Sequence, residues 1–428
     1  MNEEFIYYLW TYKLLINNLF TTQGETISII STGIRNTDSG PDFFNALIDI
    51  GKTRWAGNVE MHVNSSDWFK HNHNDTNEYD NIILHVVIND DRPIYRRSGE
   101  RIPTLEIKNK FNNSLFLNYE MLLKSNNSIA CSNQIHEIKQ LDKLLWLDGL
   151  MAERLEKKSL EISTLINNTK GDLLQVYYQK LSRAMGYTAN SDSMEYLASI
   201  TPLKLLLKHK NSIKQIEALL YGQAGFFDNS YDDLYPNELS KEYAFLKTKY
   251  KLTNMDSSLW RFMRMRPVSF PTIRISQLAN IIYNTSGLLN FILEMDNINN
   301  VVSILSTSAS SYWDNHFRFD AFAPGVQKKL GSSTINVILI NTIIPFIFVY
   351  GKSKRNDELQ EKALNWMAKI PSESNKITRE FISMGIKPEN AMHSQALLQL
   401  KSNYCLKKKC LRCRFGHILL NRQIIADN

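Results

Sequence analysis

The spacing of apolar residues changes near residue 116 of this 428-residue chain, and this change constrains the fold most strongly. Before it, short β-branched or alternating runs are separated by Gly, Asn, Asp and Ser, a pattern typical of strands. After it, apolar residues recur at helical spacing, as over residues 141–170. The sequence therefore predicts an α+β protein, with an α/β domain containing a mixed sheet at residues 1–115 and a mainly α-helical domain at residues 116–428.

The expected elements of the first domain follow from local patterns. Helical spacing predicts one helix over residues 3–20, and Gly51-Lys52 is typical of a tight hairpin between two strands. A continuous apolar run, NIILHVVI, indicates a fully buried strand. The expected strands cover residues 26–32, 43–50, 55–63 and 81–88.

Composition narrows the class of protein. The hydrophobic fraction of 43% and the charged fraction of 22% are ordinary for a globular chain. Fifty basic and 43 acidic residues give a net charge of +7, which is compatible with a nucleic-acid partner and names no protein partner. The N-terminus lacks the pattern of a signal peptide, and the apolar stretch 335–350 is short and interrupted by polar residues. We expect a cytoplasmic protein that does not enter a membrane.

The stretch from Gly40 to His85 concentrates groups that bind metals, including four of the nine histidines. Because side chains alternate along a strand, Glu60 and His62 share one polar face, while Val59 and Met61 lie on the opposite, apolar face. The weaker candidates nearby are Asp67, His71, His73 and His85.

Two carboxylates in this stretch are expected to meet across the hairpin. Asp42 begins one strand and Glu60 lies late on the return strand, so both reach the same end. Carboxylates are ligands for Mg²⁺ or Mn²⁺, and such an ion activates water and stabilises charge on a phosphate. We expect Asp42, Glu60 and His62 to be catalytic, with Asp42 and Glu60 holding the ion and His62 positioning the water.

Pro41-Asp42 followed by Glu60-x-His62 resembles the signature of the PD-(D/E)XK nucleases. The expected order of helix, hairpin, third strand, helix and strand is similar to that fold. The resemblance implies metal-dependent hydrolysis of nucleic-acid phosphodiesters. His62 stands where those nucleases have lysine, so two alternatives stay open: a nucleic-acid-binding scaffold with weak or no activity, and a hydrolase of small phosphorylated metabolites.

A second resemblance covers nearly the whole chain. The segments GPDFFNALI, WAGNVEMHVNSSDWFKH, NIILHVV, FPTIRISQLA and YCLKKKCLRC are similar to the DUF2851 family, a bacterial family of unknown function. This resemblance implies no activity, so the functional prediction rests on the residues themselves.

Each candidate residue also has a simpler structural interpretation. Asp42 can cap a turn after Gly-Pro, and Asp67 can cap a short helix. His71 and His73 are either solvated or bind a phosphate or a second metal. His85 lies inside an apolar strand, which is typical of a core histidine that makes its hydrogen bonds internally.

The cysteines suggest a second metal site, of structural rather than catalytic type. Cys405, Cys410 and Cys413 are closely spaced and are followed by His417, while Cys131 is the only other cysteine. Three interpretations remain: a zinc knuckle that includes His417, an iron–sulfur cluster that includes Cys131, or a small apolar cluster around the last helix.

A basic and aromatic segment lies in the helical half. Its arginines are interleaved with Trp260, Phe262 and Phe270, a combination that suits backbone phosphates and stacked bases. The alternative is an ordinary solvated face. The expected nucleic-acid contacts are Arg261, Arg264, Arg266 and Arg274.

Overall fold

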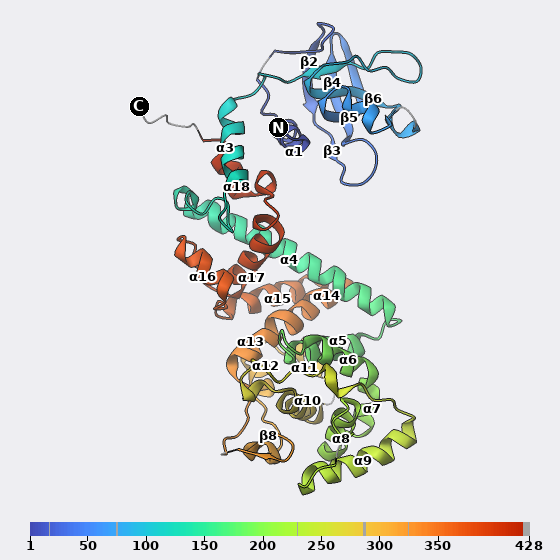
Figure 1. Ribbon diagram of the computed structural model, residues 1–428, viewed down its shortest axis with the longest axis vertical. Helices are drawn as coiled ribbons and strands as arrows, with labels where there is room; N and C mark the ends of the chain where they lie inside the picture. Colours follow the sequence, from blue (N-terminus) through green and yellow to red (C-terminus); the bar gives the residue numbers. More distant parts are fainter. Residues whose placement is uncertain (17, 74–75, 229, 286–287, 324, 423–428) are drawn as a thin grey trace. The chain divides into compact units, whose positions relative to one another are not determined.

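The computed structural model describes residues 1–16, 18–73, 76–228, 230–285, 288–323 and 325–422. The chain forms two compact units (Figure 1). The expected division at residue 115 follows the change from strands to helices, whereas the compact units divide at Leu150, within the helix α4 (Gln140–Asn168). Unit 1 contains Met1–Leu150, Asn375–Lys387 and Leu397–Asn428, and unit 2 contains Met151–Ser374 and Pro388–Ala396.

Unit 1 is built on a mixed sheet, followed in the chain by a mostly helical region, as predicted. Among the described residues the sheet has seven strands in the order β1-β2-β4-β5-β6-β7, with β3 beside β4. Pairing is antiparallel from β1 to β5 and parallel from β5 to β7. The strands are β1 (Leu19–Phe20), β2 (Thr26–Ser31), β3 (Ile34–Arg35), β4 (Phe43–Ile50), β5 (Thr53–Asn64), β6 (Ile82–Asn89) and β7 (Thr104–Glu106).

Burial explains the strand patterns. Strand β6 is buried along almost its full length because it pairs with a neighbour on both sides and is apolar on both faces. Helix α1 (Glu3–Thr11) contacts β5 and buries Phe5, Leu9 and Trp10. The helix predicted over residues 3–20 was too long, because the backbone turns left-handed at Lys13 (φ 50°) and residues 19–20 pair with β2 instead.

The C-terminal segment completes unit 1. Leu411 and Leu420 join the apolar core on the sheet. The side-chain amide of Asn118 donates to the carbonyls of Leu420 (3.1 Å) and Arg422 (3.2 Å), which fixes α18 against α3. The further helices wholly within unit 1 are α2 (Asp67–Lys70), α3 (Asn113–Lys124), α16 (Lys376–Ser383) and α18 (Arg414–Leu420).

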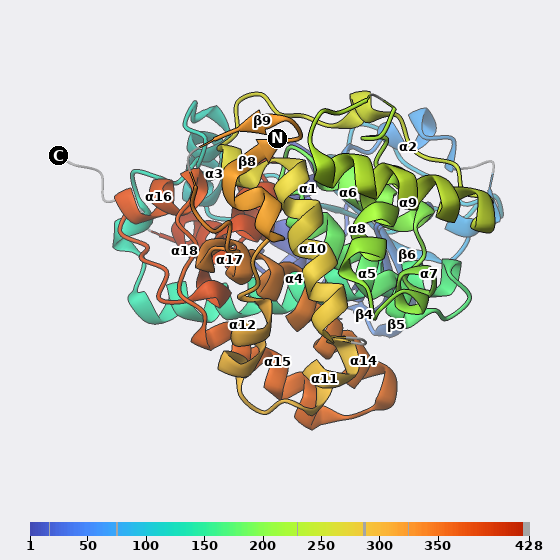
Figure 2. The same cartoon turned by 90° about the horizontal axis from the view of Figure 1, so that it is seen from below.

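Unit 2 is almost entirely helical in the part that the structure describes. Its short strands β8 (His316–Arg318) and β9 (Ala321–Phe322) lie side by side (Figure 2), where the sequence predicts limited strand content. Its helices include α5 (Leu173–Met185), α6 (Ser191–Ile200), α7 (Leu203–Lys208), α8 (Ile213–Gln223), α9 (Leu234–Tyr250), α10 (Pro271–Thr285), α11 (Leu288–Glu294), α12 (Ile298–Leu305), α13 (Ser332–Ile338), α14 (Ile344–Lys354) and α15 (Asp357–Lys369), and α17 (Ala391–Gln399) begins there.

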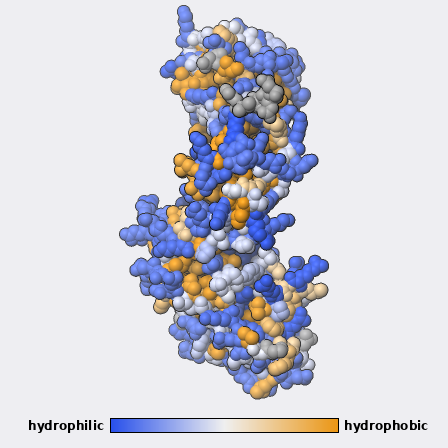
Figure 3. Space-filling model, turned by 90° about the vertical axis from the view of Figure 1, so that its left-hand side faces the viewer, coloured by the Kyte–Doolittle hydropathy of each residue, from blue (hydrophilic) through white to orange (hydrophobic). Residues whose placement is uncertain are grey.

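One continuous helix, Ser332–Lys354, is long and apolar enough to cross a membrane by length and composition. It joins α13 and α14 through a π-helical turn and is longer than the apolar stretch considered in the sequence. Within unit 2, however, 67% of its most apolar part is buried, as in the core helix of a folded domain. On the face of the molecule in Figure 3, hydrophobic residues form patches interspersed with hydrophilic ones.

Gly57 permits the close pairing of β5 with β6. A Cβ atom there would lie 2.4 Å from Ile83 Cγ2 and 2.9 Å from the Asn81 carbonyl oxygen. We expect Gly57→Ala to lower the free energy of unfolding by about 1–3 kcal/mol, because an overpacked core must shift. Urea unfolding followed by circular dichroism measures this change.

Gly331→Ala is the matched control, since a Cβ atom at Gly331 meets nothing within 4 Å. Equal stability of the two variants would contradict the close approach of β6 to Gly57.

Candidate functional site

A polar cluster lies on the parallel strands β5 and β6. Their register places Glu60 beside His85, and His71 and His73, which follow α2, contact His62. Glu60, His62, His73 and His85 are buried, whereas His71 is exposed. The cluster therefore collects one acid and four imidazoles with a single solvent-facing member.

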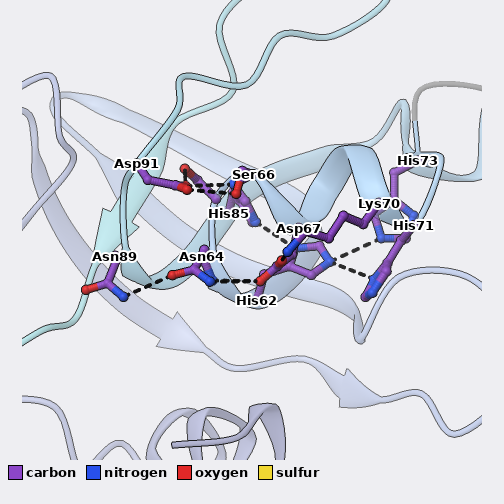
Figure 4. A network of polar contacts seen from close by, with 11 residues as sticks. His62, Asn64, Ser66, Asp67, Lys70, His71, His73, His85, Asn89 and Asp91 are labelled. Atoms are coloured by element: carbon purple, nitrogen blue, oxygen red, sulfur yellow. Dashed lines mark hydrogen bonds and ion pairs between the residues drawn. The ribbon is translucent and has the colours of Figure 1, made fainter.

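Three of these histidines form a group that can hold a metal ion. The candidate ligand nitrogens of His62, His71 and His73 all lie within 4.8 Å of one another. His62 Nε2 is 3.2 Å from His71 Nδ1 and 3.3 Å from His73 Nε2 (Figure 4). Glu60 Oε1 lies 3.1 Å from His73 Nε2 and 3.7 Å from His62 Nε2.

These separations match the edges of a metal coordination shell. Nitrogen ligands bind zinc at about 2.0–2.1 Å, and a tetrahedron of that size has edges of roughly 3.3 Å. The observed atom pairs, from 3.1 to 3.7 Å, scatter around that value. The donor atoms of His62, His73 and Glu60 therefore already surround a point that one ion can occupy, with His71 closing the exposed side.

His85 supports the group from behind. Its Nε2 lies 2.8 Å from His62 Nδ1, while its own Nδ1 is buried and has no hydrogen-bond partner among the residues that the structure describes. If His62 Nδ1 donates in this contact, the lone pair of His62 Nε2 is directed at the other two imidazoles. Trp68 contacts the rings of His62, His73 and His85 edge-on and fills the space beneath them.

Asp42 lies beside Glu60, as expected for two residues that hold one ion. Both of its carboxylate oxygens, however, accept hydrogen bonds from other residues of the chain. Its Oδ1 accepts a hydrogen bond from the Tyr7 hydroxyl (2.8 Å), and its Oδ2 accepts from the Met61 amide (2.9 Å). Its backbone amide donates to Glu60 Oε2 (3.1 Å), leaving Oε1 facing the imidazoles. Asp42 thus orients Glu60 and lies outside the three-imidazole group.

Burial is the main cause of the shifted pKa values of the carboxyl and imidazole groups in the cluster. It raises the pKa of Glu60 to about 8, and burial together with the Glu60 charge raises the pKa of Asp42 to about 7. Burial and the neighbouring imidazoles lower the pKa of His62 to about 2, and burial lowers that of His85 to about 3. The buried imidazoles are therefore neutral at pH 7, the form in which imidazole binds metals.

Asp67 has a local structural part. Its Oδ2 accepts from the Asn64 amide (3.0 Å), and its Oδ1 pairs with Lys70 (2.5 Å) at the beginning of α2.

Two neighbours of the polar cluster, Glu3 and Tyr7, lack a strong sequence signal. Tyr7 binds Asp42, and Glu3 interacts electrostatically with His71 and His73. Glu3 and Tyr7 are four residues apart on α1 and so share one helical face, which is the only signal the sequence offers.

The four cysteines converge in unit 1 although Cys131 is distant from the others in sequence. They line a cavity of about 20 Å³, and all four are unpaired thiols. Burial raises the pKa of Cys131 to about 12 and that of Cys410 to about 11. The expected knuckle with His417 is not assembled, because His417 Nδ1 lies 3.0 Å from the Tyr8 hydroxyl and His417 does not line the cavity.

The four arginines expected to contact nucleic acid divide into two kinds. Arg261, Arg264 and Arg266 are exposed. Arg274 is only 5% exposed and donates to Gln277 Oε1 (2.9 Å) from inside α10. Arg274 therefore does not belong to the solvated basic face, because helix α10 packs with this side chain inward.

The fold and site together define a two-unit α+β protein whose N-terminal mixed sheet carries a candidate metal centre. The chain belongs to the DUF2851 family, described as a protein of unknown function, whose model matches residues 3–376. No curated protein and no solved structure matches the chain.

The geometry predicts one ion bound per chain by the histidine group. We expect Zn²⁺ or Mn²⁺ to bind the purified protein in isothermal titration calorimetry, and His73→Ala to weaken the affinity at least tenfold because one of the buried donors is lost. His136→Ala, which removes an exposed histidine outside the cluster, serves as the control. Equal affinity of the two variants would show that the ion binds elsewhere.

Proposed function

We propose that this protein is a metal-dependent phosphodiester hydrolase that acts on nucleic acid. The observation that carries the proposal is the group formed by His62, His71 and His73. Glu60 Oε1 lies 3.1 Å from His73 Nε2, and Asp42 is hydrogen-bonded to Glu60. The site has one solvent-facing ligand and buried supporting groups, an arrangement suited to chemistry on a bound substrate.

The order of elements in unit 1 supports a PD-(D/E)XK-like core. Helix α1 precedes the antiparallel strands β2, β4 and β5, and α2 then leads to β6, which is parallel to β5. Asp42 immediately precedes β4, while Glu60 and His62 lie on β5. These are the positions that the resemblance assigns to the acidic residues and, with histidine replacing it, to the lysine.

The donor set favours a transition metal. Mg²⁺ prefers oxygen ligands and waters, whereas imidazole nitrogens suit Zn²⁺ and also accept Mn²⁺. With three imidazoles and one carboxylate as donors, we therefore propose Mn²⁺ or Zn²⁺, and not the Mg²⁺ that the sequence also allowed. When bound, such an ion supplies a Lewis acid that activates water and stabilises the charge on a phosphate.

The side chains around the proposed ion have separate roles. The Asp42 amide fixes one oxygen of Glu60, and the Tyr7 hydroxyl fixes Asp42. His62 is 1% exposed and its Nε2 faces two other imidazoles, so it acts as a ligand and not as a substitute for lysine. His71 is the exposed member, so substrate reaches the site from its side.

Nucleic acid is the substrate that the charge distribution favours. Unit 2 exposes Arg261, Arg264 and Arg266 close together in sequence, next to the aromatic residues Phe262 and Phe270, and the whole chain carries a charge of +7. These features suit contacts to phosphates and bases. The alternative is a nucleic-acid-binding scaffold, which would share these contacts without turnover.

Cleavage of plasmid, single-stranded DNA and RNA with Mn²⁺, Zn²⁺, Mg²⁺ or a chelator tests the proposal. We expect cleavage with Mn²⁺ or Zn²⁺, and Glu60→Gln to reduce it at least a hundredfold because the amide cannot supply the carboxylate ligand beside His62 and His73. Glu25→Gln, at an exposed glutamate, is the charge-matched control.

Binding of these polymers that weakens with salt, without cleavage under any metal condition, would favour the scaffold instead.

We also propose that the four cysteines bind an iron–sulfur cluster with a structural role. The four thiols line one cavity and act electrostatically on one another, so Cys131 belongs to the same set as the three C-terminal cysteines. Four cysteine thiolates are the usual ligand set of an iron–sulfur cluster.

The surroundings of the cysteines support this interpretation. The backbone amides of Phe415 and Gly416 act on the Cys413 thiol and lower its pKa, although burial raises it more. The Trp146 side chain acts on the same sulfur and also lowers the pKa of the Cys413 thiol. Donors directed at sulfur stabilise bound thiolates. Four unpaired thiols also suit a reducing compartment such as the cytoplasm.

Protein purified without oxygen should contain iron and sulfide and absorb visible light. We expect Cys131→Ser to remove most of the iron, and His417→Ala to leave it unchanged because His417 lies outside the cavity. Zinc in place of iron, or loss of metal with His417→Ala, would contradict the four-cysteine cluster.

A further inference from the structure

Unit 2 contains a pocket of about 580 Å³ whose charged side chains are all basic. Among the residues that the structure describes, four cations line it and no acidic residue does, although acids make up almost half of the chain's charged residues. Serine, threonine and tyrosine hydroxyls lie among the cations. The groups that the argument uses are Tyr187, Arg266, Ser269, Arg274, Lys328 and Lys329.

Arg274 is a buried cation that forms no ion pair with any residue in the described part of the chain. It donates to Gln277 Oε1 (2.9 Å), Ser269 Oγ (3.3 Å) and Thr334 Oγ1 (3.3 Å), which are all uncharged. Its Nε is buried with no hydrogen-bond partner in the part of the chain that the structure describes. Because arginine does not lose its proton in proteins, burial of this charge is costly, and an anion bound in the pocket would offset the cost.

Lys328 adds a second buried cation to the same wall. It is 4% exposed, and its Nζ donates to the backbone carbonyls of Asp314 (2.9 Å) and Val326 (2.8 Å). These carbonyls fix the ammonium group without neutralising it. Gln277 joins the two cations, since it accepts from Arg274 and donates to the Lys328 carbonyl (2.8 Å).

Tyr187 lines the pocket and has a strained backbone conformation. Its φ of 51° lies in the left-handed region, which a bulky side chain rarely adopts. The strain places its hydroxyl 2.8 Å from Thr334 Oγ1 and its ring 5.5 Å from the Arg274 guanidinium. Strained residues of this kind persist where the surrounding structure holds them, which is common at binding sites.

We propose that this pocket binds the phosphate group of an anionic ligand. Arginine, lysine and hydroxyl donors together match phosphate oxygens, and 580 Å³ is within the range of small-molecule sites. The phosphate belongs either to a small phosphorylated molecule or to a nucleic-acid strand. The proposal does not depend on the metal centre, because all of the pocket residues lie in unit 2.

Calorimetric titration of the full-length protein with pyrophosphate tests this inference. We expect saturable binding at constant ionic strength, weakened at least tenfold in the double variant Arg266→Gln/Lys329→Gln. Both of these residues are exposed, so the fold is retained. Lys241→Gln, at an exposed lysine outside the pocket, is the control and should bind pyrophosphate like the parent.

A single-stranded oligonucleotide, added as a competitor, identifies the source of the phosphate. Competition that the double variant weakens assigns the pocket to nucleic acid, and its absence assigns it to a small phosphorylated ligand. Arg274→Met should also abolish pyrophosphate binding, and if that variant fails to fold, the double variant decides. Absence of saturable binding, or equal affinity of the double variant and parent, would overturn the inference.

Discussion

A carboxylate and several imidazoles are withdrawn from water on an otherwise apolar sheet, and this constraint organises unit 1. A buried polar group costs free energy unless it finds a partner, so each member of the group must lie within reach of another. Gly57 lets β6 approach β5 and bring His85, the turn after α2 brings His73, and α1 brings Tyr7. Three separate chain segments therefore pack together around one polar cluster.

The three candidate sites share a physical property. The first gathers neutral imidazoles, the second gathers thiols, and the third gathers cations without acids. Like groups do not collect in a protein interior for their mutual attraction, since each opposes the ionisation or the charge of the next. The ligand that we propose for each place has a definite chemistry: an ion that accepts nitrogen lone pairs, a metal that accepts sulfur, and an anion.

The sequence predicted what local periodicity encodes. Alternation along β5 placed Glu60 and His62 on one face, and the apolar run of β6 indicated its burial. Contacts between residues far apart in the sequence were harder to predict, because they depend on turns that have no periodic pattern. The position of His73 beside Glu60 and that of Cys131 beside the three C-terminal cysteines could therefore not be predicted. The burial of Arg274 could not be predicted, because a basic residue at helical spacing looks the same whether its face is solvated or packed.

The discontinuity of unit 1 has a consequence for biosynthesis. Residues 1–150 leave the ribosome first, whereas Leu411, Leu420 and three cysteines emerge only after unit 2 has been made. At about 5–20 residues per second, the nascent sheet waits many seconds with part of its apolar core uncovered. Such a chain suits protection by a chaperone, and premature termination near residue 396 would leave the first unit permanently open even though most of the polypeptide had been translated.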